Sequence, residues 1–237
     1  KIRWPKTALD LVLDPPFAEE ISDKVGASDA DTISNIMLKA AVIKKVDEDF
    51  LTRMIDLEFK NLTEDNKNMA FRGNCICTRF IGNYAKVIGI YWVNSMFLKS
   101  TQELNDNILQ GKNYEINPAK GETNPENFLG FLQAVLASII KHFKKPPPKI
   151  VHLIRTIHQK ATEKFGDFGF TLSFGFFFLR FIVPMISVTD NLIIDFKLEP
   201  KTKQVLLNTS IVLMSAVNKG DLNEKKPYYH YFNDFSA

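Results

Sequence analysis

The sequence lacks most of the patterns that mark enzymes and metal proteins. It has only two cysteines in 237 residues, Cys75 and Cys77. Their C-x-C spacing fits neither a zinc site nor a disulfide framework, so we expect a reducing compartment and no metal. None of the four histidines has metal-ligand spacing, and there is no P-loop, dinucleotide fingerprint or nucleophile elbow. These absences argue against a conventional active site with a cofactor of its own.

An excess of one charge is also missing, as is any alternating strand pattern. The 30 basic and 27 acidic residues are interspersed and give a net charge of +3, which makes no electrostatic case for nucleic acid or a membrane surface. Hydrophobic residues make up 45% of the chain, enough to fill a sizeable core. There is no signal sequence, and the chain begins at Lys1 without a methionine, so we expect a domain of a longer protein.

Apolar residues recur at helical spacing along most of the chain and predict an all-α fold. The expected elements are a short helix or turn within residues 1–28, helices over 31–46 and from 47 through 57, one or two core helices over 75–98, an irregular connection over 99–123, helices over 125–145 and 148–165, a Phe-rich helix, a helix over 205–218 and the start of another at 227–235. The residues expected to cap or break these helices are Asp31, Asp47, Asn124 with Pro125, Gly166, Gly169 and Pro200.

The Phe-rich helix combines aromatic density with one charge. Four of the five residues from Phe174 to Phe178 are phenylalanine, and Arg180 follows in a run that stays apolar to Ile186. A helix without a polar face belongs in the centre of a bundle. An unpaired guanidinium there costs several kcal/mol or more, so Arg180 must hold carboxylate or backbone acceptors. We do not expect a membrane span, because residues 170–186 are short for one and Arg180 lies near their midpoint.

A second arginine lies in a segment rich in turn-forming residues. Residues 63–74 end in Arg72-Gly-Asn, and Gly73 permits backbone geometry that other residues resist. We therefore expect Arg72 at a loop tip. Arg72 and Arg180 are the two residues of the chain that suggest chemistry.

Three successive motifs resemble the catalytic domains of Ras-GTPase-activating proteins (RasGAPs), in the order and spacing of neurofibromin and its relatives. They are Phe71-Arg-Gly-Asn74 with the following Cys-Ile-Cys-Thr-Arg, then Phe178-Leu-Arg-Phe-Ile-Val-Pro184, then Phe232-Asn-Asp-Phe235. The resemblance covers about residues 30–237. It implies a single all-α domain of the RasGAP type over residues 31–237, with a central apolar helix, preceded by an N-terminal flanking segment over residues 1–30.

The resemblance also implies roles for both arginines. Arg72 matches the arginine finger, which enters the nucleotide site of a small GTPase where negative charge builds during phosphoryl transfer. Arg180 matches an arginine that braces the finger loop through the loop backbone. The positions that match partner-binding residues of the family are Phe71, Gly73, Asn74, Leu179, Pro184 and Asn218.

Two positions depart from the family pattern. The family carries a lysine seven residues before the asparagine that matches Asn218, and this chain has Ile211 there. Met185 replaces the alanine that usually follows the motif's proline. The loss of a cross-interface ion pair predicts slower association or altered partner preference more than lost chemistry.

The implied partner is a Ras-family small GTPase in its GTP form, which supplies GTP and Mg²⁺ itself. We expect no nucleic acid, and membrane contact only indirectly through a lipidated GTPase, for a cytoplasmic protein recruited to the inner face of membranes. One alternative is a catalytically silent scaffold of the same fold that binds a GTP-loaded GTPase. Another is an unrelated helical interaction or lipid-binding domain, which the even charge distribution disfavours.

Overall fold

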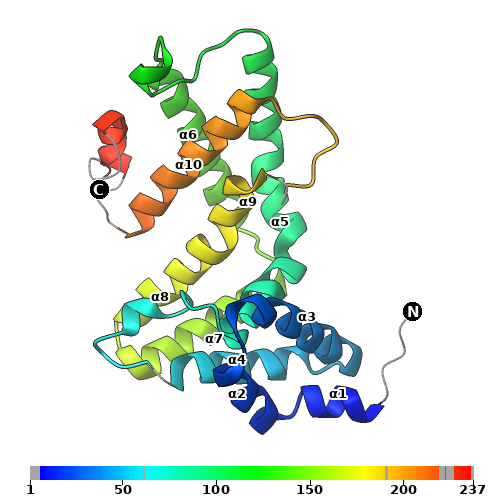
Figure 1. Cartoon of the computed structure of the whole chain (residues 1–237). Helices are drawn as coiled ribbons and strands as arrows, with labels where there is room; N and C mark the ends of the chain where they lie inside the picture. Colours follow the sequence, from blue (N-terminus) through cyan, green and yellow to red (C-terminus); the bar gives the residue numbers. More distant parts are fainter. Residues whose placement is uncertain (1–5, 61, 190–191, 219–221, 223–226, 236–237) are drawn as a thin grey trace. The chain divides into compact units, whose positions relative to one another are not determined.

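The protein is described by a computed structural model that covers residues 6–60, 62–189, 192–218, 222 and 227–235 (Figure 1). These residues form helices and no strand, which confirms the all-α prediction. The α-helices are α1 (Lys6–Val12), α2 (Pro15–Lys24), α3 (Ala27–Lys44), α4 (Asp47–Lys60), α5 (Ile76–Leu109), α6 (Pro125–Phe143), α7 (Pro148–Phe165), α8 (Phe168–Phe176), α9 (Val183–Ser187) and α10 (Pro200–Asn218). The shorter turns are η1 (Lys67–Met69), η2 (Pro118–Lys120), the π-helix η3 (Phe177–Ile182) and the 3₁₀-helix η6 (Pro227–Phe235).

The chain divides into two compact units. The first contains residues 1–88 and 148–176, and the second contains residues 89–147 and 177–237. Residues 1–30 belong to the first unit, where α1 packs against α2 and α3. The division into a flanking segment over 1–30 and a domain over 31–237 stays a prediction.

The first unit is built around α4, which packs against α3 and α7. Its apolar stripe buries Phe50, Leu51, Met54, Ile55 and Phe59. Acidic residues in its first turn and Lys60 in its last complement the helix dipole. The start of α5 is joined to α3 where the Asn83 amide donates to Ser34 Oγ at 3.0 Å.

Helices α7 and α8 lie very close together at Gly169. A Cβ atom at this position would stand 2.3 Å from Thr162 Oγ1 and 2.6 Å from the Thr162 backbone nitrogen. The sequence prediction that Gly169 breaks a helix is therefore wrong, since it lies inside α8 and permits close packing. The break falls at Gly166, whose φ of 57° suits a glycine after a helix end.

In the second unit, buried asparagines of α5 hold the chain that leads into α10. The Asn94 side chain donates to Ile193 O at 3.0 Å and accepts from Ile193 N–H at 2.8 Å. Asn105 Oδ1 accepts from the backbone N–H of Glu199 at 2.9 Å and from the Thr202 hydroxyl at 2.8 Å. Such bonds satisfy the buried polar groups of an irregular segment and so fix where α10 begins.

Helix α6 and the C-terminal motif meet in the same unit. The Asn124 side chain accepts from Asn127 N–H at 3.0 Å and Pro125 is the first helical residue, which confirms the predicted cap. The ring of Phe232, from the third motif, packs edge-on against Phe128 of α6 with centroids 4.9 Å apart.

Three predicted boundaries are wrong. Helix α3 begins at Ala27, so Asp31 lies inside it rather than at its cap. Helix α5 continues to Leu109. The residues after Leu98 are mostly polar, but one face of this part of the helix is buried through Thr101, Leu104 and Asn105. Pro200 begins α10 instead of interrupting the chain before it, because a proline needs no hydrogen bond at the first helical position.

The Phe-rich segment is helical from Phe168 to Ser187, through α8, η3 and α9. These 20 residues are long and apolar enough to cross a membrane by length and composition alone, so the length argument against a span is wrong. However, 61% of the apolar stretch is buried inside the protein, as in the core helix of a soluble domain. Burial is not uniform, because Phe170 and Phe174 are 65% and 39% exposed and stack on each other.

Candidate functional site

Arg72 lies in the turn between η1 and α5, and its side chain is exposed. Its backbone N–H donates to Met69 O at 3.0 Å, which closes the turn. Gly73 and Asn74 are exposed beside it. Asn74 Oδ1 accepts a hydrogen bond from Arg79 Nη2 of α5 at 3.0 Å. The predicted loop therefore presents a guanidinium, a glycine and an amide on one short surface segment of the first unit.

Phe71 anchors this loop from inside. It is only 2% exposed, and its ring lies 5.5 Å from that of Phe59 and 4.9 Å from that of Phe176, edge-on to both. Its φ is 58°, a left-handed conformation that costs an L-residue about 1–2 kcal/mol. Burial of a phenylalanine is worth about 1.5–3 kcal/mol, which offsets this cost. The side chain therefore supports the loop from inside, and the contact of Phe71 with a partner stays a prediction.

The left-handed residue of this loop is Phe71 and not Gly73. Gly73 does not have a positive φ, and a Cβ atom there would lie no closer than 3.7 Å to Thr78 Oγ1. Among the described residues of the unit, no contact requires a glycine at position 73. Arg72 lies in the predicted loop, although Gly73 does not use the backbone freedom that a glycine permits.

Glu58 of α4 holds the same loop through its carboxylate. Its Oε1 accepts from Phe71 N–H at 2.6 Å, and its Oε2 accepts from the Thr78 hydroxyl at 2.5 Å. Sequence reasoning missed this residue because a glutamate between Leu57 and Phe59 on an amphipathic helix carries no motif. Only the fold brings it to the loop.

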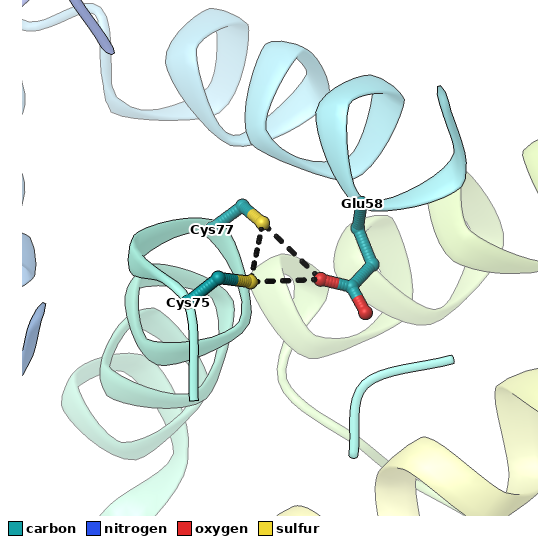
Figure 2. Close-up of side chains that lie close together, drawn as sticks. All are labelled: Glu58, Cys75 and Cys77. Atoms are coloured by element: carbon teal, nitrogen blue, oxygen red, sulfur yellow. Dashed lines mark hydrogen bonds between the residues drawn. The ribbon is translucent and has the colours of Figure 1, made fainter. Parts of the chain in front are cut away.

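The two cysteines also converge on Glu58, as Figure 2 shows. Cys75 Sγ and Cys77 Sγ share a hydrogen bond across 2.9 Å, and this bond is the main reason that the pKa of Cys75 falls to about 6. The same bond, together with burial and the negative charge of Glu58, raises the pKa of Cys77 far above its usual range. The shared hydrogen bond therefore shifts the pKa values of the two cysteines in opposite directions.

The second predicted arginine lies in η3. Leu179 and Arg180 are half-buried on this π-helical turn, whereas Phe177, Phe178, Phe181 and Ile182 are buried. The helix is therefore a core helix, as predicted, with a partly buried guanidinium at Arg180. π-Helical turns are rare and often mark functional sites.

Aromatic packing holds this turn in the second unit. The Phe177 ring lies 5.1 Å from Phe143 and 5.9 Å from Trp92. Both η3 and α9, which carries the half-buried Pro184, pack against α10. Helix α10 ends at Asn218, an exposed residue whose amide donates to Met214 O at 2.8 Å.

The structure thus brings the predicted residues together in two groups. Arg72, Gly73 and Asn74 share one loop of the first unit, while Leu179, Arg180 and Pro184 lie on consecutive turns of the second unit. The predicted contact between Arg180 and the loop joins two units and stays a prediction.

Most of the known proteins with similar sequences that were compared are described as Ras GTPase-activating proteins. The chain is 27% identical to human Ras GTPase-activating protein 2 over 56% of its length, and 24% identical to the inhibitory regulator protein IRA2 of Saccharomyces cerevisiae over 88%. It is 20% identical to Ras GTPase-activating protein gap-2 of Caenorhabditis elegans over 99%. The chain is similar to Ras GTPase-activating proteins.

The length of the aligned part limits the conclusions that this similarity supports. No family model matches the sequence. The aligned part covers 16%, 7% and 21% of these three relatives respectively. The relatives support a RasGAP-type domain, and the particular likeness to neurofibromin stays a prediction.

Proposed function

We propose that this domain stimulates GTP hydrolysis by a Ras-type small GTPase, with Arg72 as an arginine finger. The observation that carries the proposal is the exposed Arg72 beside the buried Phe71, whose ring and backbone N–H are both held. An arginine finger must place its charge inside another protein, so its side chain must be exposed and its backbone must be rigid. This loop has an exposed arginine and a backbone that is held in place. The similarity to Ras GTPase-activating proteins supports the same function.

In this proposal the guanidinium of Arg72 lies against the β- and γ-phosphate oxygens of bound GTP, where charge accumulates in the transition state. Such a finger accelerates hydrolysis about 10³–10⁵-fold, the magnitude established for Ras with its activating protein. The main-chain carbonyl of Arg72 steadies the glutamine that orients the attacking water. Lysine is a poor substitute because it lacks the planar fork that bridges two oxygens.

Arg180 is proposed to brace the finger loop by donating hydrogen bonds to its backbone. Leu179, Pro184 and Asn218 are proposed to line the surface that receives the GTPase, with Gly73 and Asn74 beside the finger. The GTPase supplies the nucleotide and Mg²⁺, so the domain needs no cofactor for this reaction. We propose that it acts in the cytoplasm on membrane-attached GTPases that carry GTP.

Single-turnover GTP hydrolysis tests the proposal on a panel of Ras, Rap and Rho proteins. The wild-type domain is expected to accelerate at least one Ras-like member, and Arg72→Ala is expected to abolish the acceleration while sparing binding to the GTP form. A folded wild-type domain that accelerates none of them refutes the activator. GTP-dependent binding without acceleration would instead identify the silent scaffold.

The Arg180→Lys variant distinguishes a role of Arg180 in bracing the finger loop from a role in stabilising the fold. It keeps the positive charge but removes the forked donors, so we expect a loss of activation with unchanged thermal unfolding and unchanged GTPase binding. If the Arg180→Lys domain activates as well as the wild type, Arg180 does not brace the finger.

A further inference from the structure

The proposed function leaves one chemical cluster of the first unit unused. Cys75 Sγ and Cys77 Sγ lie 3.6 Å and 3.2 Å from Glu58 Oε2, and 2.9 Å from each other. One potential ligand atom from each residue falls within 4.8 Å of the others (Figure 2). Two sulfurs and a carboxylate oxygen that point at one place form a candidate metal site, which the C-x-C spacing alone did not indicate.

We propose that Glu58, Cys75 and Cys77 bind a zinc ion. Tetrahedral zinc, with Zn–S near 2.3 Å and Zn–O near 2.0–2.2 Å, separates its ligand atoms by about 3.5–3.8 Å. The two sulfur–oxygen distances nearly match this spacing. The sulfurs must move apart by less than about 1 Å, and Cys75 can move because it precedes the first turn of α5.

The ligand set selects the class of metal. Thiolates favour zinc and other thiophilic ions, whereas Mg²⁺ and Ca²⁺ require oxygen ligands. Three protein ligands leave a fourth tetrahedral position for water or a further ligand. Cys77 is buried and Cys75 is half-buried, so an ion reaches the site from the side of Cys75.

The surroundings of Glu58 suit a metal ligand. Its Oε1 accepts the Phe71 N–H at 2.6 Å and its Oε2 accepts the Thr78 hydroxyl at 2.5 Å, which orients the carboxylate and leaves the second lone pair of Oε2 to bind the ion. Hydrogen bonds of this kind fix a ligand and raise metal affinity. The Thr78 hydroxyl, 3.1 Å from Cys75 Sγ, is a further outer partner.

A zinc ion at this place would tie together three parts of the unit. Glu58 belongs to α4, Cys77 belongs to α5, and Cys75 directly follows the loop of residues 71–74. The loop would then be attached to the ion at one end through Cys75 and at the other through Phe71 N–H and Glu58. The site stands whether or not Arg72 acts on a GTPase, and its test uses no GTP hydrolysis.

Metal binding by the complete 237-residue chain tests the proposal. The chain is first freed of metal under reducing, oxygen-free conditions, and two free thiols are counted before any metal is added. After zinc addition and gel filtration, elemental analysis is expected to find one zinc per chain. Cobalt(II) in its place is expected to show sulfur-to-cobalt charge transfer in the near ultraviolet and the intense visible bands of a tetrahedral ion. Because the chain has only two cysteines, this signal reports on Cys75 and Cys77.

Variants identify the ligands. Cys75→Ser and Glu58→Gln are each expected to weaken zinc binding at least about 100-fold, and Gln keeps an oxygen that can accept from Phe71 N–H. The matched control is Asp65→Asn, an exposed carboxylate near the loop, which is expected to bind zinc like the wild type. Circular dichroism shows that each variant is folded.

Several outcomes overturn the site. A reduced chain with two countable thiols that retains no zinc and gives no cobalt–sulfur band does not contain it. Equal zinc affinity of the wild type and the two ligand variants also excludes it. Slower reaction of both thiols with a thiol reagent in the presence of zinc supports it independently of any variant.

Discussion

Phe71 shows how one residue reconciles a strained backbone with a fixed position. Its left-handed φ of 58° is unusual for an aromatic residue. The rings of Phe59 and Phe176 enclose its side chain, and Glu58 accepts its N–H. The strain is localised beside Arg72, where a loop held in one conformation is useful. Backbone strain supported by its surroundings is common at functional sites.

Replacing Phe71 with Ala and with Gly separates these two effects. Both changes remove the ring, and we expect Phe71→Ala to lower the free energy of unfolding by about 3–5 kcal/mol. Phe71→Gly is expected to be less destabilising than Ala by about 1 kcal/mol, because glycine adopts a positive φ freely.

Urea unfolding measures both values. Met69→Ala is the control, since Met69 is 58% exposed and its loss should change stability by no more than about 0.5 kcal/mol. An alanine variant at least as stable as the glycine variant would contradict the left-handed backbone at position 71.

At the scale of elements, the part of the Phe-rich segment that forms α8 packs closely on α7. Gly169 lets the two helices approach until no Cβ atom fits against Thr162. Phe176, at the end of α8, reaches the ring of Phe71. The spacing of these helices therefore bears on the support of the Arg72 loop.

Two glycines of α8 are predicted to respond in opposite directions to alanine. Gly169→Ala places a methyl group 2.6 Å from a backbone nitrogen, and we expect destabilisation of about 1–3 kcal/mol. Gly175→Ala meets no atom within 4 Å and is expected to be neutral or to stabilise the helix by up to about 1 kcal/mol. Thermal unfolding of the two variants checks the pair. Equal effects of the two changes would show that α7 and α8 are not packed this closely.

The face of α10 that carries Asn218 offers a test of partner recognition. Ile211 and Asn218 are seven residues apart and lie on one side of the helix. If an acidic GTPase surface lies there, Ile211→Lys is expected to raise the association rate roughly two- to tenfold at low salt, with the gain lost at high salt. Stopped-flow binding to a GTP-loaded GTPase measures this rate. Ile211→Met, which adds no charge, should leave it unchanged, and a gain that persists in high salt would argue against an ion pair.

At the scale of the whole molecule, charge and apolar surface bear on membrane attachment. The net charge of +3 comes from nearly equal numbers of acids and bases, which provides no strong attraction to anionic lipid. The apolar Phe168–Ser187 stretch is mostly buried inside the protein. Indirect attachment through a lipidated GTPase therefore remains our prediction.

Vesicle flotation distinguishes the two routes to a membrane. The chain alone is expected to stay in solution with vesicles that contain phosphatidylserine, and to float when they carry a lipidated Ras-type GTPase loaded with a non-hydrolysable GTP analogue. The same vesicles with the GDP form are the control. Flotation of the chain alone would show direct membrane binding and would call for a test of the Phe168–Ser187 stretch.

The sequence by itself determined the helical class, α6 and α7 within a few residues, and the loop position of Arg72. These features depend on local signals, namely the period of apolar residues, the Asn124 cap and the turn formers before Arg72. It also indicated the family resemblance, since three motifs keep their order along the chain. The period of apolar residues could not show that α5 continues through the polar residues after Leu98. The residues that contact this part of the helix lie far along the chain.

Only the tertiary structure decided what surrounds Arg72. Which residue takes the positive φ depends on the packing of Phe71 against Phe59 and Phe176, so Phe71 adopts it although a glycine lies two residues further on. The Glu58–Cys75–Cys77 cluster joins residues that are 17 and 19 positions apart, and no spacing rule connects them. Helix periods, caps and turns depend on neighbouring residues. The packing around Phe71 and the convergence of Glu58 with the two cysteines form only when distant segments of the chain meet.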